Sequence, residues 1–421
     1  MLTKAPRGTN DILPEESVKW QYIEQTARDV CARFGYGELR TPTFEHTELF
    51  ARGVGDTTDV VEKQMYTFLD KGERSITLRP EGTAGAARAF IERNLGAGAL
   101  PVKLFYLLSC FRYEKPQAGR LREFHQFGVE VFGSQEPSID AEVISLAMTF
   151  LRELGLKGLE LHINSIGCPT CRKAYNELLR SYFAAHEDTL CDTCRGRLAR
   201  NPLRILDCKS PICQELAAGA PRLLDHICED CRVHFDQVKS RLNALSIDYT
   251  IDTGIVRGLD YYTKTVFEII SSDIGAQGTV CGGGRYDGLI EELGGKPCAG
   301  IGFALGLERL LLTMQNQGIS FPAAPAAALY IASIGEAADL CAEQLVFSLR
   351  QQGFSCEKDR MGRSLKAQMK YADKLGVRYC MVIGDDEIQK RAASLKDMQT
   401  GASQEVSFDS LCDVLARQIN R

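Results

Sequence analysis

The sequence predicts an α+β fold with an antiparallel sheet, a mostly helical insertion between parts of that sheet, and a separate C-terminal α/β domain. Residues 103–132 form two apolar stretches around a turn with Pro116 and Gly119, which is typical of a long antiparallel hairpin. Residues 166–246 have helical patterning and hold eight of the sixteen cysteines, which indicates an insertion or subdomain. Beyond a linker at 315–327, strand and helix patterns alternate.

Size, composition and charge indicate a globular protein of two or three domains. The 421 residues carry a net charge of −5, which argues against coating nucleic acid by bulk charge but leaves a local basic face open. No apolar run has the length of a signal peptide or a membrane span, so we expect a cytoplasmic protein that does not enter a membrane. The cysteines are then better interpreted as thiols or metal ligands than as disulfides.

Hydrophobic periodicity predicts the elements of the first part of the chain. Apolar residues at four-residue spacing before Gly35 predict an amphipathic helix, and Thr83 is a plausible N-cap residue for a second helix. The expected elements are a helix at 15–34, a strand at 38–41 stopped by Pro42, a loop at 52–55, a strand at 64–68 and a helix from about residue 84.

The same patterns predict the elements after the hairpin. Up to the linker we expect a helix at 138–155, a strand at 159–163, helices that include 174–185 and 234–245, strands at 249–252 and 265–270, a glycine-rich loop at 278–288, a strand at 299–305 and a helix from 307. The C-terminal domain is expected to contain strands at 329–332, 354–358 and 378–383, helices at 337–351 and 364–375, two weaker strands and a helix at 409–418.

The hairpin is the first candidate for a functional surface. Because side chains alternate faces along a strand, Arg112 shares a face with Glu114, and Gln126 shares one with Glu130. If these faces coincide, one surface carries a cation, two carboxylates and an amide, with Arg120 in the loop free to cover an anion. A solvent-facing hairpin with cross-strand ion pairs is the alternative.

Other motifs exclude some nucleotide sites and suggest further polar contacts. Residues 282–288 lack the GxGxxG order, and no GxxxxGK[ST] occurs, so a Rossmann or P-loop site is not expected. Residues 257–262 place an arginine, an acid and two tyrosines close together, although an ordinary loop explains them as well. Arg309 in an apolar helix needs a carboxylate or a phosphate, and an intramolecular ion pair satisfies that need as well as a ligand does.

Together these motifs resemble those of the class II aminoacyl-tRNA synthetases. Residues 112–114 with 124–126 resemble motif 2, residues 302–309 resemble motif 3, and the segment that ends at Pro42 resembles motif 1. The segments 257–268 and 279–289 are similar to the two histidine-specific signatures. The resemblance to the histidyl-tRNA synthetase family covers essentially the whole chain, and it implies a class II antiparallel sheet flanked by helices.

The resemblance also implies a division of the chain. The expected parts are a catalytic domain with motifs 1 and 2 at 1–165, a helical Cys-rich insertion at 166–246, the rest of the catalytic domain at 247–320, and an α/β anticodon-binding domain at 328–421. Residues 353–396 hold ten Lys or Arg against six Asp or Glu, which suits contact with tRNA phosphates, although a solvated charged face is the alternative.

Roles for individual residues follow from the same resemblance. It implies that Arg112 and Arg257 carry catalysis by holding the α-phosphate and the substrate carboxylate. The implied histidine-binding residues are Glu81, Thr83, Arg112, Gln126, Glu130, Arg257, Tyr261 and Tyr262. The implied ATP-binding residues are Arg112, Glu114, Arg120, Phe124 and Arg309. Phe124 would stack on adenine, and Arg120 and Arg309 would hold the β,γ-phosphates together with Mg²⁺. Gln117 would face the acceptor end of the tRNA.

The implied activity is that of a histidine–tRNA ligase that uses ATP, L-histidine and tRNA(His) and acts as a homodimer. Because the nucleophile of the first step is already a carboxylate, no protein base is needed, and alignment and charge neutralisation suffice. The rival is a non-charging relative, the regulatory subunit of ATP phosphoribosyltransferase. That relative lacks the anticodon-binding domain, whereas this chain has a full C-terminal domain and retains Arg112, Arg257 and Arg309.

The cysteines suggest a metal site that the resemblance does not include. Cys168 and Cys171, followed by Cys191 and Cys194, have zinc-ribbon spacing. A second set that would complete another site consists of Cys208, Cys213, Cys228 and Cys231. The sequence is consistent with two alternatives, structural Zn²⁺ sites and cysteine thiols on helices that bind no metal.

Overall fold

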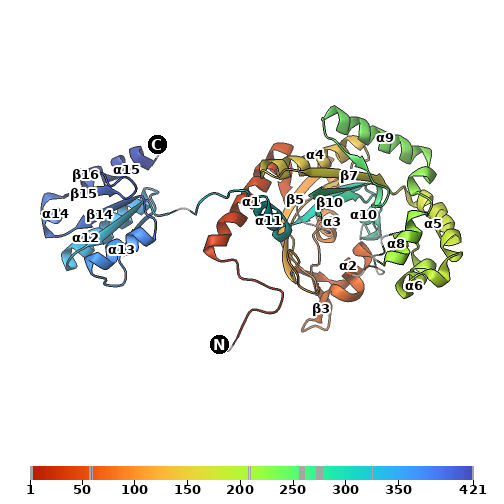
Figure 1. Ribbon diagram of the computed structural model, residues 1–421, viewed down its shortest axis with the longest axis horizontal. Coiled ribbons are helices and arrows are strands. Elements are labelled where there is room, and N and C mark those ends of the chain that lie inside the picture. The colour runs from red at the N-terminus through yellow and green to blue at the C-terminus, as the bar shows by residue number, and fades with distance from the viewer. Residues whose placement is uncertain are drawn as a thin grey trace. The chain divides into compact units, whose positions relative to one another are not determined.

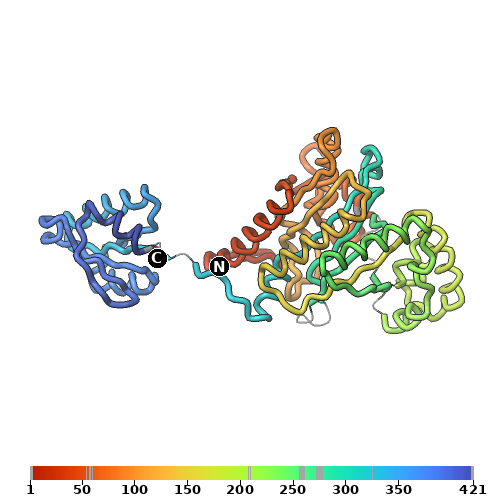
Figure 2. Tube along the Cα trace, turned by 90° about the horizontal axis from the view of Figure 1, so that it is seen from above, coloured from red at the N-terminus to blue at the C-terminus, as the bar shows by residue number. Residues whose placement is uncertain are grey.

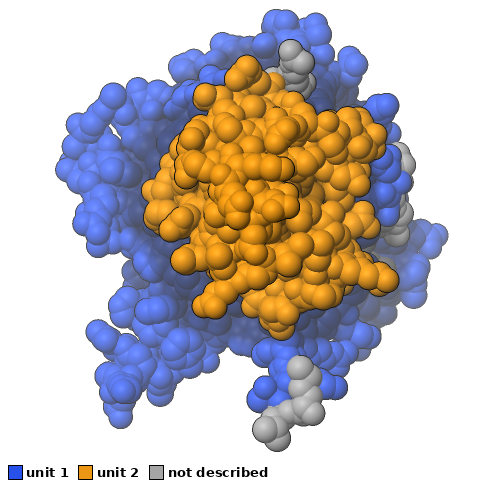
Figure 3. All heavy atoms as spheres, turned by 90° about the vertical axis from the view of Figure 1, so that its left-hand side faces the viewer, with its two compact units in different colours: residues 1–322 blue, residues 323–421 orange. Residues whose placement is uncertain are grey.

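The chain folds into two compact units, residues 1–322 and 323–421, which Figure 3 colours separately. The structure is a computed structural model that describes residues 3–55, 58, 60–206, 208, 210–255, 261–271, 278–324 and 326–419. Each unit has hydrophobic clusters of its own. None of the helices in these ranges combines the length and the apolar character that crossing a bilayer requires.

A mixed, largely antiparallel sheet is the centre of the first unit (Figure 1). In the described part of the chain its strands, in spatial order, are β1 (Gly37–Glu38), β5 (Val102–Phe111), β6 (Glu123–Phe132), β11 (Gly300–Gly306), β10 (Thr279–Arg285), β9 (Thr263–Ser271), β7 (Leu159–Ser165) and β8 (Thr250–Ile251). The two edge pairs, β1 with β5 and β7 with β8, are parallel, and the six central strands are antiparallel. The predicted antiparallel sheet is therefore confirmed.

The predicted hairpin is β5 and β6, and its register runs from Val102 opposite Phe132 to Phe111 opposite Glu123. The alternation of β6 explains its position, since Phe127 and Val129 point into the core while Gln126 and Glu130 point to the opposite face. The polar face of the predicted hairpin is thus the floor of a cavity, and the alternative of a solvent-facing hairpin is wrong.

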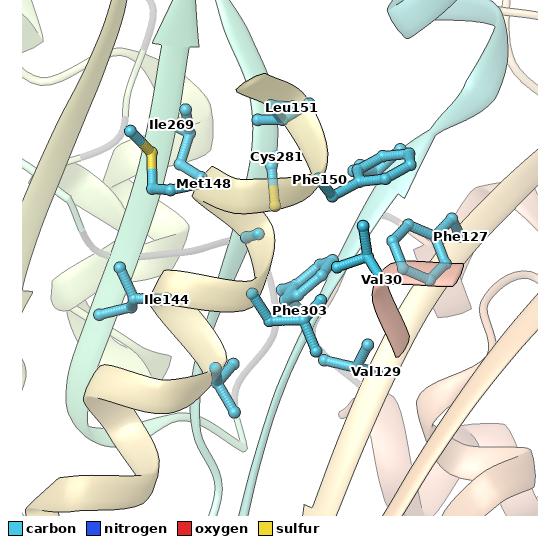
Figure 4. Close-up of a cluster of buried hydrophobic side chains, with 14 of the residues drawn as sticks. Val30, Phe127, Val129, Ile144, Met148, Phe150, Leu151, Ile269, Cys281 and Phe303 are labelled. Atoms are coloured by element: carbon cyan, nitrogen blue, oxygen red, sulfur yellow. The ribbon is translucent and has the colours of Figure 1, made fainter. Parts of the chain in front are cut away.

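Helices cover the apolar face of this sheet. They are α1 (Pro14–Phe34), α4 (Pro137–Glu153), α9 (Glu229–Ala244) and α11 (Leu307–Asn316). Figure 4 shows Val30 of α1 and Phe150 of α4 meeting Phe127 and Phe303 of the sheet. The long apolar stripes of α1 and α4 bury against the strands, and Gly35, with φ of 77°, ends α1 in the left-handed conformation.

The other side of the first unit carries a small sheet and short helices, of which α3 contributes Thr83 to a cavity. The described strands are β2 (Phe44–His46), β4 (Ser75–Leu78) and β3 (Tyr66–Leu69), and the helices are α2 (Thr47–Val54), α3 (Thr83–Glu92) and α10 (Leu289–Glu292). The predicted loop at 52–55 is wrong, because α2 continues through Gly53. That glycine lets α2 pack closely on α3, since a Cβ there would lie 3.3 Å from the Cβ of Ala84.

The predicted glycine-rich loop at 278–288 is also wrong, because residues 279–285 are the central strand β10. Low strand propensity is overridden by tertiary packing, since a Cβ at Gly283 would collide with the carbonyl of Gly302 on β11. A Cβ at Gly284 would likewise meet Thr265 on β9. Glycine therefore allows three central strands to approach at this point.

The insertion leaves the sheet after β7 and returns through α9, which packs on α4. Its other helices are α5 (Pro169–Ala184), α6 (Asp192–Arg200), α7 (Leu203–Leu206) and α8 (Pro211–Ala218). Figures 1 and 2 both show α5, α6 and α8 as a lobe that projects from the sheet.

The second unit is a sheet of strands ordered β13, β12, β14, β15 and β16 with helices packed on it. In this part of the chain the described strands are β12 (Leu329–Ser333), β13 (Cys356–Lys358), β14 (Tyr379–Ile383), β15 (Ala392–Asp397) and β16 (Ser403–Ser407), and the helices are α12 (Glu336–Gln351), α13 (Leu365–Lys374), α14 (Asp385–Lys390) and α15 (Leu411–Ile419). The first three strands are parallel, as the strand–helix alternation predicts. The short helix α14 was not predicted.

Candidate active site

A cavity of about 550 Å³ lies over the polar face of the central strands. Its size is in the range of small-molecule and cofactor sites. Eleven of the residues selected from sequence line it, although they come from segments up to 228 residues apart: Glu81, Thr83, Arg112, Glu114, Arg120, Phe124, Gln126, Glu130, Tyr261, Tyr262 and Arg309.

One selected residue, Gln117, lies outside this cavity, and another, Arg257, is not among the described residues. Gln117 is exposed at the tip of the hairpin loop and lines a second cavity of about 600 Å³, which shares Gly119, Leu121 and Glu308 with the first. The loop is tight, because the amides and carbonyls of Gln117 and Arg120 pair with each other. Arg257 lies outside the described residues, so its predicted place in the site stays a prediction.

Glu81 sits at one end of the cavity because it caps a helix. Its two carboxylate oxygens accept the backbone N–H groups of Thr83 and Ala84 at 2.7 and 2.8 Å, in the first turn of α3. Burial raises the pKa of Glu81, and these two donors oppose that rise. The N-cap role expected for Thr83 is therefore wrong, since the carboxylate of Glu81 satisfies the amides that begin the helix.

Glu130 lies beside this cap at the centre of a cluster of hydroxyl groups. Its carboxylate accepts hydrogen bonds from Thr83 Oγ1 at 2.7 Å, from the Tyr106 hydroxyl at 3.0 Å and from the hydroxyl of Tyr286. Only 1% of the residue is exposed, and this burial raises the pKa of Glu130 to about 8, against the effect of the hydroxyl donors. Burial therefore favours the protonated form of this carboxyl group at neutral pH.

A tyrosine wall closes this end. The rings of Tyr261 and Tyr262 lie 4.7 Å apart, and Tyr286 stands 5.5 and 6.4 Å from them. All three are buried. Tyr286 and Tyr106 were missed from the sequence, and the available signal for Tyr286 was its position at the end of the glycine-rich segment.

Gly302 makes room for the buried carboxylate. A Cβ at this position of β11 would collide with Glu130 Oε2 and lie 2.9 Å from the Tyr286 hydroxyl. Gly128 on β6 does the same for the ring of Tyr106. The small residues of the central strands thus define the depth of the cavity.

The other end of the cavity carries arginines. Arg112 donates from Nε to the carbonyl of Pro80 at 2.8 Å, and its guanidinium lies 5.2 Å from the centre of the Phe124 ring. Glu114 lies 4.0 Å from Arg112 and 3.6 Å from Arg120. The carboxylate of Glu114 thus lies between two guanidinium groups.

Arg309 adds a third guanidinium group to this end. It donates to the carbonyl of Thr279 at 3.1 Å, so a backbone oxygen is one of its partners. Burial lowers the pKa of Arg309, the charge of Arg120 lowers it further, and Glu114 opposes both. Crowded and partly desolvated cations of this kind favour a bound polyanion.

Glu308, the neighbour of Arg309, was missed as a site residue. Its carboxylate accepts the backbone N–H of His125 at 3.0 Å and contacts His125 Nδ1 at 2.9 Å. It thereby ties α11 to β6 and lines both cavities. The cavity as a whole can hold a ligand with a cationic or N–H-donating end beside Glu81 and Glu130 and a phosphate end beside the arginines.

The selected cysteines lie outside this cavity, and their predicted grouping is corrected. Cys168 and Cys171 gather with Cys228 and Cys231, whereas Cys191 and Cys194 gather with Cys208 and Cys213. The two pairs of the predicted ribbon are separated by α5, whose sixteen residues span about 24 Å at 1.5 Å per residue.

The comparisons with known proteins agree with this geometry. A family model described as Histidyl-tRNA synthetase matches residues 8–177 and 214–310, and one described as Anticodon binding domain matches residues 328–418. The chain is 59% identical to the Histidine--tRNA ligase of Acetivibrio thermocellus over 98% of this chain and 99% of that protein. It is 54% identical to that of Clostridioides difficile over the full length of both.

A solved structure supports the same conclusion. The crystal structure of apo S. aureus histidyl-tRNA synthetase is 42% identical, covers 98% of this chain and 100% of its own, and superposes with a TM-score of 0.86. The fold resembles that structure from the first helix through the C-terminal unit. The chain belongs to the histidyl-tRNA synthetase family.

Proposed function

We propose that this protein is a histidine–tRNA ligase. It activates L-histidine with ATP to histidyl-adenylate, releases pyrophosphate, and transfers the histidyl group to the 3′ end of tRNA(His). The observation that carries the proposal is one cavity with a buried carboxylate end and a three-arginine end. Full-length identity to relatives named Histidine--tRNA ligase favours this activity over that of a regulatory subunit.

Histidine binds at the carboxylate end in this proposal. Glu81 and Glu130 accept from its ammonium group and its imidazole N–H, and the rings of Tyr261 and Tyr262 enclose the side chain. Thr83 and Gln126 complete the polar wall. An apolar amino acid would leave buried polar groups without partners, at a cost of about 1–3 kcal/mol for each group, so selection needs no editing site.

ATP occupies the arginine end. Arg112 holds the α-phosphate, Arg120 and Arg309 take the β,γ-phosphates, and Phe124 stacks on adenine near Glu114. Mg²⁺ binds through one or two carboxylates together with substrate phosphates, and the oxygen donors Glu114 and Glu268 in the cavity wall fit that requirement. When bound, the ion neutralises phosphate charge.

The residues promote the first step by alignment and charge neutralisation. The histidine carboxylate is the nucleophile, so the site needs no general base. Arg112 orients the α-phosphate for in-line attack, and Arg257 neutralises the charge between that phosphate and the carboxylate.

Transfer to tRNA uses the hairpin tip and the second unit. The exposed position of Gln117 beside the second cavity suits contact with the acceptor end. In the proposed division, residues 1–165 and 247–320 catalyse, residues 166–246 are the insertion, and residues 328–421 bind the anticodon.

The protein acts in the cytoplasm as a homodimer in this proposal. The dimer forms through the segment around Pro42, because that segment resembles motif 1. Sedimentation equilibrium tests the oligomeric state.

Histidine-dependent ATP–pyrophosphate exchange tests the proposed function. We expect exchange by the wild-type protein and a loss of about 100-fold or more in Arg112→Ala and Arg257→Ala, since each removes charge stabilisation at the α-phosphate. Arg33→Ala, which removes a surface ion pair with Glu153, is the matched control and should retain full exchange. Wild-type protein without exchange would contradict the ligase assignment.

A further inference from the structure

We propose that the insertion holds two mononuclear structural Zn²⁺ sites, each made of four cysteine thiolates, and that the first fastens the insertion to the catalytic sheet. The proposal does not depend on the ligase activity. The first site consists of Cys168, Cys171, Cys228 and Cys231, and the second of Cys191, Cys194, Cys208 and Cys213.

The sulfur positions fit tetrahedral zinc. Within each group all four sulfur atoms lie within 4.8 Å of one another. In the first group, Cys168 Sγ lies 3.5 Å from Cys171 and 4.0 Å from Cys228, and the sulfurs of Cys171 and Cys231 are 3.9 Å apart. A tetrahedral ion with Zn–S bonds of about 2.3 Å places its sulfurs about 3.8 Å apart.

The second group has the same dimensions. The sulfurs of Cys191 and Cys208 are 3.8 Å apart, and Cys194 and Cys213 are fully buried. All four of these cysteines fall between the two segments matched by the family model. Four thiols at this spacing, three of them buried and Cys191 partly buried, are a complete, closed ligand set of the kind that structural zinc sites use.

The backbone around both groups stabilises thiolates. Cys168, Cys191 and Cys228 are the N-cap residues of α5, α6 and α9, so the positive ends of these helices begin at these cysteines. Backbone N–H groups also donate to sulfur, from Cys228 to Cys171 at 3.1 Å and from Cys191 to Cys213 at 3.4 Å. Donors to the sulfurs are the outer-shell contacts that metal ligands require.

Apolar packing, disulfide bonds and iron–sulfur clusters each fit these groups less well than zinc does. All sixteen cysteines lie in the described part of the chain, and none forms a disulfide bond. Only eight of them belong to a group of four neighbouring thiols. Apolar packing of individual thiols does not explain why these eight form two groups of four. Disulfide sulfurs would be about 2.05 Å apart. The four cysteines of an iron–sulfur cluster are divided among two or more iron atoms, which separates some of their sulfurs more widely than these groups allow.

The first site joins the start of the insertion to the start of its last helix, α9, next to a segment that pairs with β9. Ile166 N donates to the carbonyl of Lys264 at 2.8 Å, and Lys264 N donates to that of Gly167 at 2.9 Å. Lys264 follows the cavity residue Tyr262 by two positions. Gly167, with φ of 62°, turns the chain into the site, and a Cβ there would lie 2.6 Å from the Cβ of Cys171.

Elemental analysis of the wild-type protein, purified without chelator, is the first test. We expect two zinc atoms per chain. After zinc is replaced by Co²⁺, we expect thiolate-to-cobalt charge-transfer bands and the visible spectrum of a tetrahedral ion. Protein without metal, with iron in place of zinc, or with a cobalt spectrum lacking the thiolate bands would overturn the proposal.

Paired variants test the assignment of ligands. Cys228→Ser with Cys231→Ser should lose one zinc atom, and Cys208→Ser with Cys213→Ser should lose the other. The control pair, Cys341→Ser with Cys412→Ser, removes two partly buried thiols that line one cavity of the second unit and should retain both atoms. Loss of zinc from the control, or none from either site pair, contradicts the assignment.

Hydrogen–deuterium exchange tests the fastening role. In the first-site variant, the amides of Ile166 and Lys264 should exchange about tenfold faster, because the metal no longer holds the segment that they pair with. The second-site variant should leave these two amides unchanged. Equal effects of both variants, or of neither, would show that the first site does not hold the insertion to the sheet.

Discussion

At the residue scale, Glu130 decides how the site responds to pH. Its pKa of about 8 in the folded protein lies well above the ordinary 4.5 of a glutamate, because burial disfavours the carboxylate. The folded state therefore retains a proton that the unfolded state releases, and this group makes the protein less stable as the pH rises from about 4.5 to about 8. A cationic ligand beside Glu130 would reverse the preference and release the proton.

The prediction is that histidine binding at pH 7 releases a proton from the wild-type protein, with a smaller release from Glu130→Gln. The amide keeps the shape of the carboxyl group but does not titrate. Calorimetry in two buffers of different ionisation enthalpy measures the difference. Equal proton release by the two proteins would mean that Glu130 does not meet the charged group of the ligand.

The free energy of unfolding of the wild-type protein should also fall more between pH 5 and 8 than that of Glu130→Gln.

At the element scale, one buried ion pair connects a strand, a core helix and the last helix of the insertion. Arg285 of β10 is fully buried and pairs with Asp140 of α4 at 2.5 Å, and Asp140 also contacts His234 of α9 at 3.1 Å. Burial alone would raise the pKa of Asp140, but Arg285 and His234 hold it below its usual value. The helices are thus fixed in register on the sheet.

Asp140→Asn should lower the free energy of unfolding by about 3–5 kcal/mol, because Arg285 then remains buried and charged without its main counterion. Urea unfolding monitored by circular dichroism measures this change. Glu153→Gln breaks an exposed ion pair from the same helix to Arg33 and should cost less than about 1 kcal/mol. Similar losses in the two variants would contradict the role of the buried pair.

Local patterns predicted most of the elements, whereas contacts distant in sequence explain several of the errors. The hairpin was predictable because its apolar alternation is complete within thirty residues. Strand β10 was not, since its glycines make sense only beside Gly302 and Thr265 of neighbouring strands. Pairing of cysteines 60 residues apart, and the contact of Tyr286 with Glu130, also lie beyond any local pattern.

At the scale of the whole molecule, the two units have separate cores. The second unit buries its own apolar residues, among them Leu329, Ile331 and Met381, within residues 323–421. The proposed activation site lies wholly in residues 1–322. The chemistry of histidine activation should therefore not require the second unit.

A fragment of residues 1–322 should retain histidine-dependent pyrophosphate exchange within about tenfold of the full chain but charge tRNA at least about 100-fold more slowly. Full-length protein is the reference in both assays, and the fragment should unfold cooperatively. A folded fragment that charges tRNA as fast as the full chain would contradict the tRNA-binding role of the second unit.

The part of the insertion between Cys168 and Cys228 begins and ends at the same place, since the sulfurs of these two residues are only 4.0 Å apart. Because the ends of this lobe adjoin, its length does not change the distance between the strands before and after it. The pairing of β7 with β9 is therefore independent of the length of the lobe. Insertions or deletions in this lobe can therefore be accepted while the catalytic framework keeps its shape.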